Sequence, residues 1–173
     1  MKNLGLFILL SFSFIIFSCD EENVVEGCTD PLACNYDSEA TDLLLGSCNY
    51  PLDSVLEFTY SEDNVSGVVG EDAISHIHIM NSSCETISIK ARKFFNSTDE
   101  FSAYFCFAGV CFGSDVTVSP TTLMLESFEE DDYFKAYFNS SVAGTYEVTY
   151  RFYLENDSDT YIEKVITYEI SES

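Results

Sequence analysis

Cys106 and Cys111 are the pair of reactive side chains whose spacing is easiest to interpret. Four residues separate them, and one of the four, Gly109, can adopt the left-handed conformation that tight turns need. At the two ends of a short hairpin the Cα atoms lie at disulfide distance. A C-x4-C pair also suits metal binding or redox chemistry, but no second cysteine pair or histidine cluster lies nearby in the sequence. We therefore expect a structural disulfide between Cys106 and Cys111.

A second group of cysteines consists of Cys28, Cys34, Cys48 and Cys84. Three of the four fall in one short segment, so either one of them bonds to Cys84 or one thiol stays free. We expect Cys28–Cys48 together with Cys34–Cys84, which would clamp the segment onto the rest of the chain. The pairing of Cys28–Cys34 with Cys48–Cys84 stays open. A segment this short cannot build its own hydrophobic core and depends on such crosslinks.

The segment itself, residues 27–51, has a recognisable pattern. It reads Gly-Cys-Thr-Asp-Pro-Leu-Ala-Cys-Asn-Tyr, later Ala-Thr, and finally Gly-Ser-Cys-Asn-Tyr-Pro. This pattern resembles the short module G-C-T-D-P-x-A-C-N-Y…A-T…D-G-S-C-x-Y-P of secreted Bacteroidetes proteins. One copy is present, and Leu44 and Leu45 replace the acidic pair that the family carries before Gly-Ser-Cys.

Oxygen-bearing side chains in this module are candidate calcium ligands, because calcium prefers carboxylate and amide oxygens. Their spacing is not that of an EF-hand loop, and Asp and Asn are also the residues that turns need. The two leucines in place of acidic residues weaken the case further. We expect no resident cofactor, with calcium as the alternative at four positions: Asp30, Asn35, Asp37 and Asp42.

His76 and His78 are the only histidines, and on a strand they would share one face. That geometry can hold zinc or copper, but a third ligand would have to come from elsewhere, either Cys84 or a carboxylate. No nucleophile elbow, phosphate-binding loop, dinucleotide fingerprint or zinc-protease motif is present. The acidic run at 129–132 is interpreted as a solvated loop. The sequence therefore predicts no enzyme, and a small hydrolase or metal-dependent enzyme is the alternative.

Cys19 ends a segment of a different kind. Lys2 precedes an apolar run over residues 4–17, and Ser18 is the small residue before the cysteine. The run has about 14 residues, whereas a transmembrane helix needs about 20, so the pattern predicts a secretory signal. The boundary at Cys19 resembles the lipobox of bacterial lipoproteins. The resemblance implies a signal peptide over 1–18 and a diacylated Cys19 that anchors the mature chain in the outer membrane or at the cell surface.

Residues 19–26 are acidic and lack an apolar pattern, so we interpret them as a flexible tether. The acidic residues directly after Cys19 also resemble the surface-export signal of Bacteroidetes lipoproteins. An extracytoplasmic location is one where disulfides persist, and six cysteines remain once Cys19 is assigned to lipid.

The net charge of the chain is strongly negative. Once Lys2 leaves with the signal, six basic residues remain against 30 acidic ones, a net charge of −24. Such a field repels nucleic acid and anionic lipid head groups. The charge therefore excludes nucleic acid as a partner and favours a basic or cation-bridged partner.

The remainder, residues 53–173, is rich in β-branched and aromatic residues that alternate with polar ones. Alternation with period two, broken by Asn, Ser, Asp and Gly turns, is typical of an antiparallel β-sandwich. In the strand predicted at 145–154, for example, Tyr146, Val148 and Tyr150 face inward, and Thr149 faces outward. The strand predicted after it should pair with it as a hairpin whose loop is 156–159. The predicted strands are 55–60, 73–80, 86–95, 101–107, 116–118, 122–125, 133–138, 145–154 and 161–170.

This part also resembles the Ig-like or fibronectin-III-like domains of Bacteroidetes surface lipoproteins. The likeness rests on Phe-Cys-Phe at 105–107, Val-Cys-Phe at 110–112 and Ala-Gly-Thr-Tyr at 143–146. It implies a fold and no activity. The expected fold is all-β: a small disulfide-stapled cysteine module at 27–52 and an antiparallel Ig-like β-sandwich at 53–173. The expected function is a non-catalytic binding, adhesion or scaffold module that is held at the membrane by lipid and meets a protein or glycan partner of the cell envelope.

Overall fold

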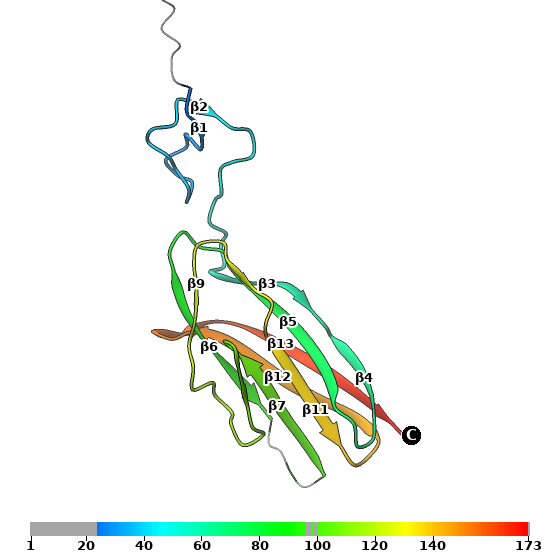
Figure 1. Ribbon diagram of the computed structural model, residues 1–173. Coiled ribbons are helices and arrows are strands. Elements are labelled where there is room, and N and C mark those ends of the chain that lie inside the picture. The colour runs from blue at the N-terminus through cyan, green and yellow to red at the C-terminus, as the bar shows by residue number, and fades with distance from the viewer. Residues whose placement is uncertain (1–23, 96–97, 99, 173) are drawn as a thin grey trace, which may run out of the picture.

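The computed structural model describes residues 24–95, 98 and 100–172 (Figure 1). The described residues form strands and loops, and they build a β-sandwich of two sheets preceded by a small cysteine module. The predicted signal peptide, Cys19 and most of the predicted tether lie outside the described residues. Within these residues, no helix has the length and apolar character needed to cross a membrane.

The first sheet has the strand order β10-β5-β11-β7-β8, and β3 pairs with β5 as well. All of these pairings are antiparallel. The strands are β3 (Leu56–Ser61), β5 (Ala73–Asn81), β7 (Phe101–Phe107), β8 (Val110–Phe112), β10 (Glu130–Asp131) and β11 (Lys135–Ser140).

The second sheet has the strand order β4-β13-β12-β6-β9. Its longest pairing is the antiparallel hairpin of β12 and β13, which confirms the hairpin that the sequence predicts. The strands are β4 (Asn64–Val68), β6 (Ile87–Phe94), β9 (Leu123–Leu125), β12 (Gly144–Leu154) and β13 (Asp157–Ser171).

The core between the sheets follows the predicted alternation. On β12, Val148, Tyr150 and Phe152 are fully buried, whereas the residues between them face outward and keep part of their surface. Phe134 lies at the centre of an aromatic cluster: its ring centroid is 5.4 Å from that of Tyr150 and 4.8 Å from that of Phe152. Each such side chain contributes roughly 1.5–3 kcal/mol through burial, so this cluster is a main source of the sandwich's stability.

Lys93 obeys the same alternation although it is charged. It points inward from β6, and its ammonium donates hydrogen bonds to the carbonyl oxygens of Ala103 and Ser114, the latter at 2.9 Å. Burial lowers the pKa of Lys93, and the nearby Asp115 carboxylate acts in the opposite direction. The buried ammonium thus joins β6 to β7 and to the loop after β8.

Strand β4 is absent from the sequence prediction, and it pairs in parallel with β13 rather than antiparallel. A Cβ atom at Gly67 would lie 2.8 Å from the Cβ of Ala73 and 2.9 Å from the Cδ1 of Ile170. Gly67 therefore permits this close approach at the sheet edge. Glycine and serine make the segment look like a turn in the sequence, because the contact that favours a strand comes from distant residues.

Three further local predictions differ from the structure. The segment 116–118 forms no strand and makes a single bridge between Val118 and Arg92. The acidic run at 129–132, predicted as a solvated loop, contributes β10 to the first sheet, where it pairs with the end of β5. In the β12–β13 hairpin, β13 already begins at Asp157, so the turn is shorter than the predicted loop at 156–159. For the acidic run, pairing with the distant β5 decides the outcome.

The β7–β8 hairpin forms as the sequence indicates. Ala108 and Gly109 both have positive φ angles, 51° and 78°, which is the requirement of the two-residue turn that suits a twisted hairpin. The turn places Cys106 directly opposite Cys111.

The cysteine module lies beyond one end of the sandwich, at the opposite end from the C-terminus (Figure 1). It contains a short parallel pair, β1 (Glu26–Gly27) and β2 (Asp42–Leu43). Val25 accepts a hydrogen bond from the backbone N–H of Thr41 at 2.9 Å. Residues 25 and 26, expected in the tether, are therefore part of the ordered module.

Candidate functional site

The two histidines lie on the outer face of the first sheet, as the alternation of β5 predicts. The Nδ1 atom of His76 is 3.4 Å from the Oε2 atom of Glu62, which also accepts the backbone N–H of His76 at 2.7 Å. The Nδ1 atom of His78 is 3.1 Å from the Oε1 atom of Glu130, and its ring centroid is 4.9 Å from that of Tyr60. We call these five residues the histidine row.

Hydrogen bonding lowers the pKa of one carboxyl group in the row, that of Glu130. The Thr59 hydroxyl donates to Glu130 at 2.6 Å and is the main reason that the pKa of this carboxyl is lowered, with His78 adding to the effect. Glu130 is thus held as an anion beside the imidazole. A histidine with a carboxylate partner can act as an oriented base, but hydrolysis also needs a nucleophile or activated water.

Metal binding by the row lacks a complete ligand set. Among the residues that the structure describes, no three or more His, Cys, Asp or Glu side chains gather closely enough to hold a metal ion. The sequence offers Cys84 or a carboxylate as the third ligand, and Cys84 is bonded to Cys34 instead. The row therefore holds two separate histidine–carboxylate pairs.

A second group lies further along the same outer face. The rings of Tyr104 and Tyr137 stack with centroids 4.5 Å apart and an angle of 4° between their planes. The Tyr104 hydroxyl donates to Asp72 at 2.7 Å, and the Asn139 amide donates to the other oxygen of the same carboxylate at 3.0 Å. Ile74, opposite Tyr137 on β5, is 41 % exposed. We call Asp72, Ile74, Tyr104, Tyr137 and Asn139 the tyrosine platform.

The platform is ordered before any ligand arrives. Burial, followed by the hydrogen bond to Asp72, raises the pKa of Tyr104 to about 12, so its hydroxyl remains a donor at neutral pH. Stacked rings, an exposed aliphatic side chain, a carboxylate and an amide together offer apolar contact and hydrogen bonds on one face of the sheet. Such a surface suits recognition of another molecule.

Sequence reasoning did not single out the platform. The segment 133–138, which contains Tyr137, is rich in aromatic residues, and this composition is the one signal that the sequence offers. The cluster itself exists because β5, β11 and β7 are neighbours in the sheet, which aligns Tyr137 with Ile74 on one side and Tyr104 on the other. That order of strands cannot be read from any one segment.

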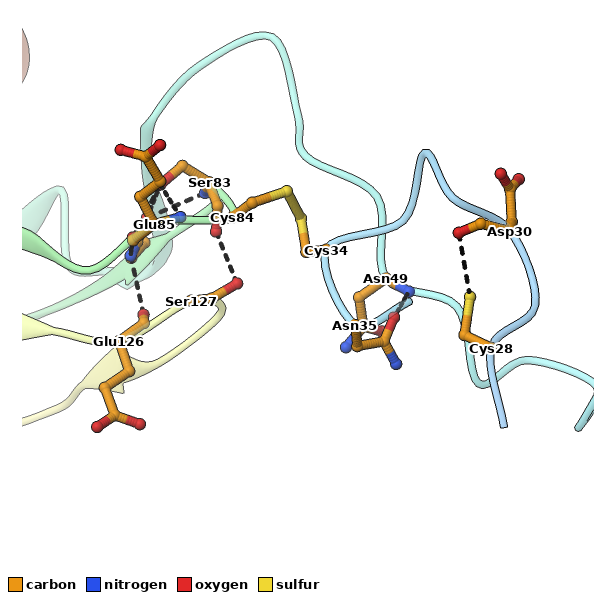
Figure 2. Close-up of a disulfide and its surroundings, with 11 residues drawn as sticks. Cys28, Asp30, Cys34, Asn35, Asn49, Ser83, Cys84, Glu85, Glu126 and Ser127 are labelled. Carbon is orange, nitrogen blue, oxygen red and sulfur yellow. Dashed lines mark hydrogen bonds between the residues drawn. A yellow bond between two sulfur atoms is a disulfide. The ribbon is translucent and has the colours of Figure 1, made fainter. Parts of the chain in front are cut away.

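The structure contains three disulfides among its described residues: Cys28–Cys48, Cys34–Cys84 and Cys106–Cys111. Of the two pairings left open by the sequence, it therefore has the expected one, in which Cys34 is the module cysteine that bonds to Cys84. Figure 2 shows Cys34 of the module reaching Cys84 in the loop that follows β5.

The loop that carries Cys84 is fixed by Asn81, which is fully buried. Its amide nitrogen lies 2.7 Å from the carbonyl oxygen of Glu85 and 2.8 Å from that of Glu126. Ser127 donates to the carbonyl oxygen of Ser83 at 2.8 Å, as Figure 2 also shows. The module is thus bonded to a rigid corner of the sandwich.

Three of the four candidate calcium ligands lie in or next to turns of the module and already accept backbone hydrogen bonds. Asp30 accepts the N–H of Leu32 at 2.9 Å and the Tyr50 hydroxyl at 2.7 Å, and these bonds lower the pKa of Asp30. Asp37 accepts the N–H of Glu39 at 2.9 Å, and Asn35 accepts that of Asn49 at 2.8 Å. Asp42 lies on β2. These bonds are those of turn residues, and calcium stays the alternative to the expected absence of a resident cofactor.

Comparisons with known proteins give weak likenesses only. No protein-family model matches the chain, and no curated protein matches it. Among solved structures, the chain is similar to the N-terminal domain of PorA, with a TM-score of 0.46 and 17% identity over 70% of this chain and 94% of that one. It is also similar to a CARDB domain from Pyrococcus furiosus in complex with di-metal ions, with a TM-score of 0.38 and 18% identity over 72% of this chain and 94% of that one.

A third similar structure is a conjugative transposon lipoprotein from Bacteroides eggerthii, with a TM-score of 0.39 and 13% identity over 65% of this chain and 93% of that one. Likenesses of this strength assign no function to the chain.

Proposed function

We propose that the protein is a lipid-anchored, non-catalytic binding module of the cell envelope, and that the tyrosine platform is its contact surface. The supporting observation is the platform itself: a pre-ordered aromatic and polar surface on an open sheet face. Cys19 is proposed as the site of acylation and the outer membrane or cell surface as the location. The partner is a protein or a glycan, and nucleic acid is excluded by the charge of the chain.

The connection between module and sandwich supports this arrangement. Besides the Cys34–Cys84 bond, the backbone N–H of Leu52 donates to the carbonyl oxygen of Ser82 at 3.0 Å. Force from a partner bound to the sandwich would therefore act on a connection that a disulfide secures. Such a connection suits an adhesion or scaffold role at a surface.

The histidine row is the observation that favours the alternative, a small hydrolase. Each histidine has a carboxylate partner, which is two thirds of a nucleophile–base–orienter arrangement. Both pairs lie on an open face, where water is not excluded from a reacting group. The enzyme alternative is therefore the weaker of the two.

The anchor is tested by replacing Cys19 with serine. We expect Cys19→Ser to lose both membrane fractionation and incorporation of labelled palmitate, whereas Ser18→Ala, which keeps a small residue before the cysteine, retains both. Unchanged fractionation and labelling of Cys19→Ser would show that the chain is not anchored in this way.

The binding role is tested by titrating the purified protein against envelope extracts at low and high salt. We expect saturable binding that weakens as salt rises, because the chain is strongly acidic. Tyr137→Ala should weaken it, and the control Thr149→Ala, on the outer face of the other sheet, should not. A parallel screen uses ester, glycoside and peptide substrates. Turnover that disappears in His76→Ala or His78→Ala would overturn the binding proposal in favour of the enzyme.

A further inference from the structure

The basic residues of this acidic chain are unevenly placed. Of the six that remain after Lys2, three point outward from the second sheet: Lys90, Arg92 and Arg151. The register of β6 and β12 places Arg92 directly opposite Arg151. Like charges at directly opposite positions destabilise an antiparallel pair. The facing arginines therefore do not serve the stability of the sheet, and we look for another role for them.

Aromatic rings hold the two guanidinium groups in place. The Cζ atom of Arg92 lies 4.7 Å from the ring centroid of Phe94, and that of Arg151 lies 5.0 Å from the same centroid. Arg151 also lies over the ring of Tyr161 at 3.8 Å. Cation–π contacts of this kind orient guanidinium groups while leaving their N–H edges free to donate.

The two arginines differ in their anionic partners. Arg151 donates from Nε and Nη2 to one oxygen of Glu163, at 2.8 Å and 2.7 Å. Within the part of the chain that the structure describes, Arg92 takes part in no ion pair. In a chain with this excess of carboxylates, an arginine without one is a ready site for an anion from outside.

A small hollow lies beside the pair. It has a volume of about 160 Å³ and is lined by Arg92, Arg151, Tyr153, Ser158 and Asp159. We call these five residues the arginine hollow. Its wall arises from a bulge in the β12–β13 hairpin: Tyr153 pairs with Tyr161 but Leu154 pairs with Asp157, so residues 158–160 are extra. Bulges of this kind commonly redirect side chains next to binding sites.

We propose that the arginine hollow binds the carboxylate of an acidic side chain from a partner protein, in a segment where a basic residue lies next to the acidic one. A carboxylate matches the paired N–H donors of a guanidinium. The hollow also contains Asp159, and the chain as a whole is strongly negative, so a purely acidic segment would be repelled and an adjacent basic residue attracted.

A sugar acid fits this site less well than a peptide. Sugars are held largely by stacking on open aromatic faces, but here guanidinium groups cover faces of Phe94 and Tyr161. The proposal concerns the opposite sheet from the tyrosine platform, so it stands or falls independently of the proposed function.

Fluorescence anisotropy with three probes tests the proposal on the purified full-length protein in detergent. The probes are a labelled peptide of alternating glutamate and lysine, the same peptide with glutamine for glutamate, and an oligogalacturonate used as a competitor. We expect the glutamate peptide to bind and the glutamine peptide to bind several-fold more weakly. Arg92→Gln should lower the affinity for the glutamate peptide by about three- to tenfold, the range for a charge-assisted contact at a partly exposed site.

Lys135→Gln is the matched control, because it removes one outward positive charge from the other sheet. It should change the affinity for the glutamate peptide by less than about twofold, because a distant charge is largely screened by salt. Arg151→Lys keeps the charge but loses the planar fork of the guanidinium. It should weaken binding by an amount between those of Lys135→Gln and Arg92→Gln. Equal binding of the two peptides, equal effects of Arg92→Gln and Lys135→Gln, or displacement by oligogalacturonate at lower concentration than by unlabelled peptide would each overturn the proposal.

Discussion

The cysteine module and the sandwich are held together in opposite ways. The sandwich has one continuous core in which large side chains such as Phe134, Tyr150 and Tyr168 are fully buried. In the described part of the module, the buried apolar residues are Cys28 and Ala33, while Leu45 is 93 % exposed. Packing therefore stabilises the sandwich, and two disulfides with a network of turn hydrogen bonds stabilise the module.

This difference predicts which changes each part tolerates. A region held by packing is sensitive mainly to the volume of its side chains. A region held by crosslinks depends on its disulfides, because they limit the conformations of the unfolded chain. The disulfide Cys34–Cys84 links the module to the sandwich, so it couples the region held by crosslinks to the region held by packing.

The largest effect should come from truncating a core aromatic residue. Tyr150→Ala should lower the free energy of unfolding by about 3–5 kcal/mol, the usual cost of removing a large buried aromatic side chain. Thr149→Ala, one residue away on the outer face, should cost less than about 1 kcal/mol. Denaturant unfolding measures both, and similar costs for the two would refute the assignment of faces on β12.

Alkaline pH should weaken the core next. Burial raises the pKa of Tyr168 to about 12, whereas an unfolded tyrosine titrates near 10. The folded state thus holds a proton that the unfolded state has lost, so this stability is complete below about pH 10 and is lost as the pH rises toward 12. Two pKa units correspond to about 2–3 kcal/mol.

Lys93 changes the stability in the opposite direction, because its pKa is lowered in the folded state. As the pH approaches 10.5, the unfolded state binds more protons at this residue than the folded state does, so the contribution of Lys93 to stability rises with pH. Comparison with Tyr168→Phe isolates the tyrosine. The variant should show a smaller decline in stability between pH 9 and 11 than the wild type, and Tyr161→Phe, an exposed tyrosine of the same strand, serves as control. Identical pH profiles for Tyr168→Phe and the wild type would contradict this prediction.

Removal of single disulfides should separate the two regions. Cys106→Ser with Cys111→Ser should cost the sandwich about 2 kcal/mol, since the closed loop is short, and leave the module attached and protected. Cys34→Ser with Cys84→Ser should cost the sandwich less than about 1 kcal/mol but expose the module to limited proteolysis. If the second variant unfolded the sandwich or left the module protected, the two regions would not be independent.

Calcium should have the smallest effect. Since Asp30, Asn35 and Asp37 already accept hydrogen bonds within their turns, millimolar calcium or a chelator should leave thermal unfolding unchanged. A rise in the melting temperature with calcium that Asp30→Asn abolishes, but that Asp159→Asn leaves intact, would establish the calcium site and contradict this expectation.

Much of the fold could be predicted because local patterns agreed with the final environment. Alternation on β5 placed His76 and His78 on one shared face, as the structure has them, and Ile77 and Ile79 occupy the buried face between them. The prediction was wrong where distant contacts outweigh local composition. The acidic β10 pairs with β5, and β4 forms at the edge of β13 because Gly67 allows a close approach.

The candidate surfaces were less predictable than the fold. Tyr104 and Tyr137 lie 33 positions apart in the sequence and meet only because β7 and β11 are neighbours. Arg92 and Arg151 meet for the same reason across β6 and β12. A residue's face can be read from its own strand, but its cross-strand neighbours depend on strand order and register.

The sequence by itself determined the class of fold, the core-facing residues of the long strands and the tight hairpin at Gly109, since each of these follows from side chains within a few positions of one another. The tertiary structure alone decided which sheets the strands form, which carbonyl groups the inward-pointing Lys93 contacts and which cysteine of the module bonds to Cys84. The physical reason is that the alternation of buried and exposed residues and the conformation of a turn are local properties of the chain. Strand order, the carbonyl partners of a buried ammonium and the distance between two sulfur atoms are set only when distant segments pack together.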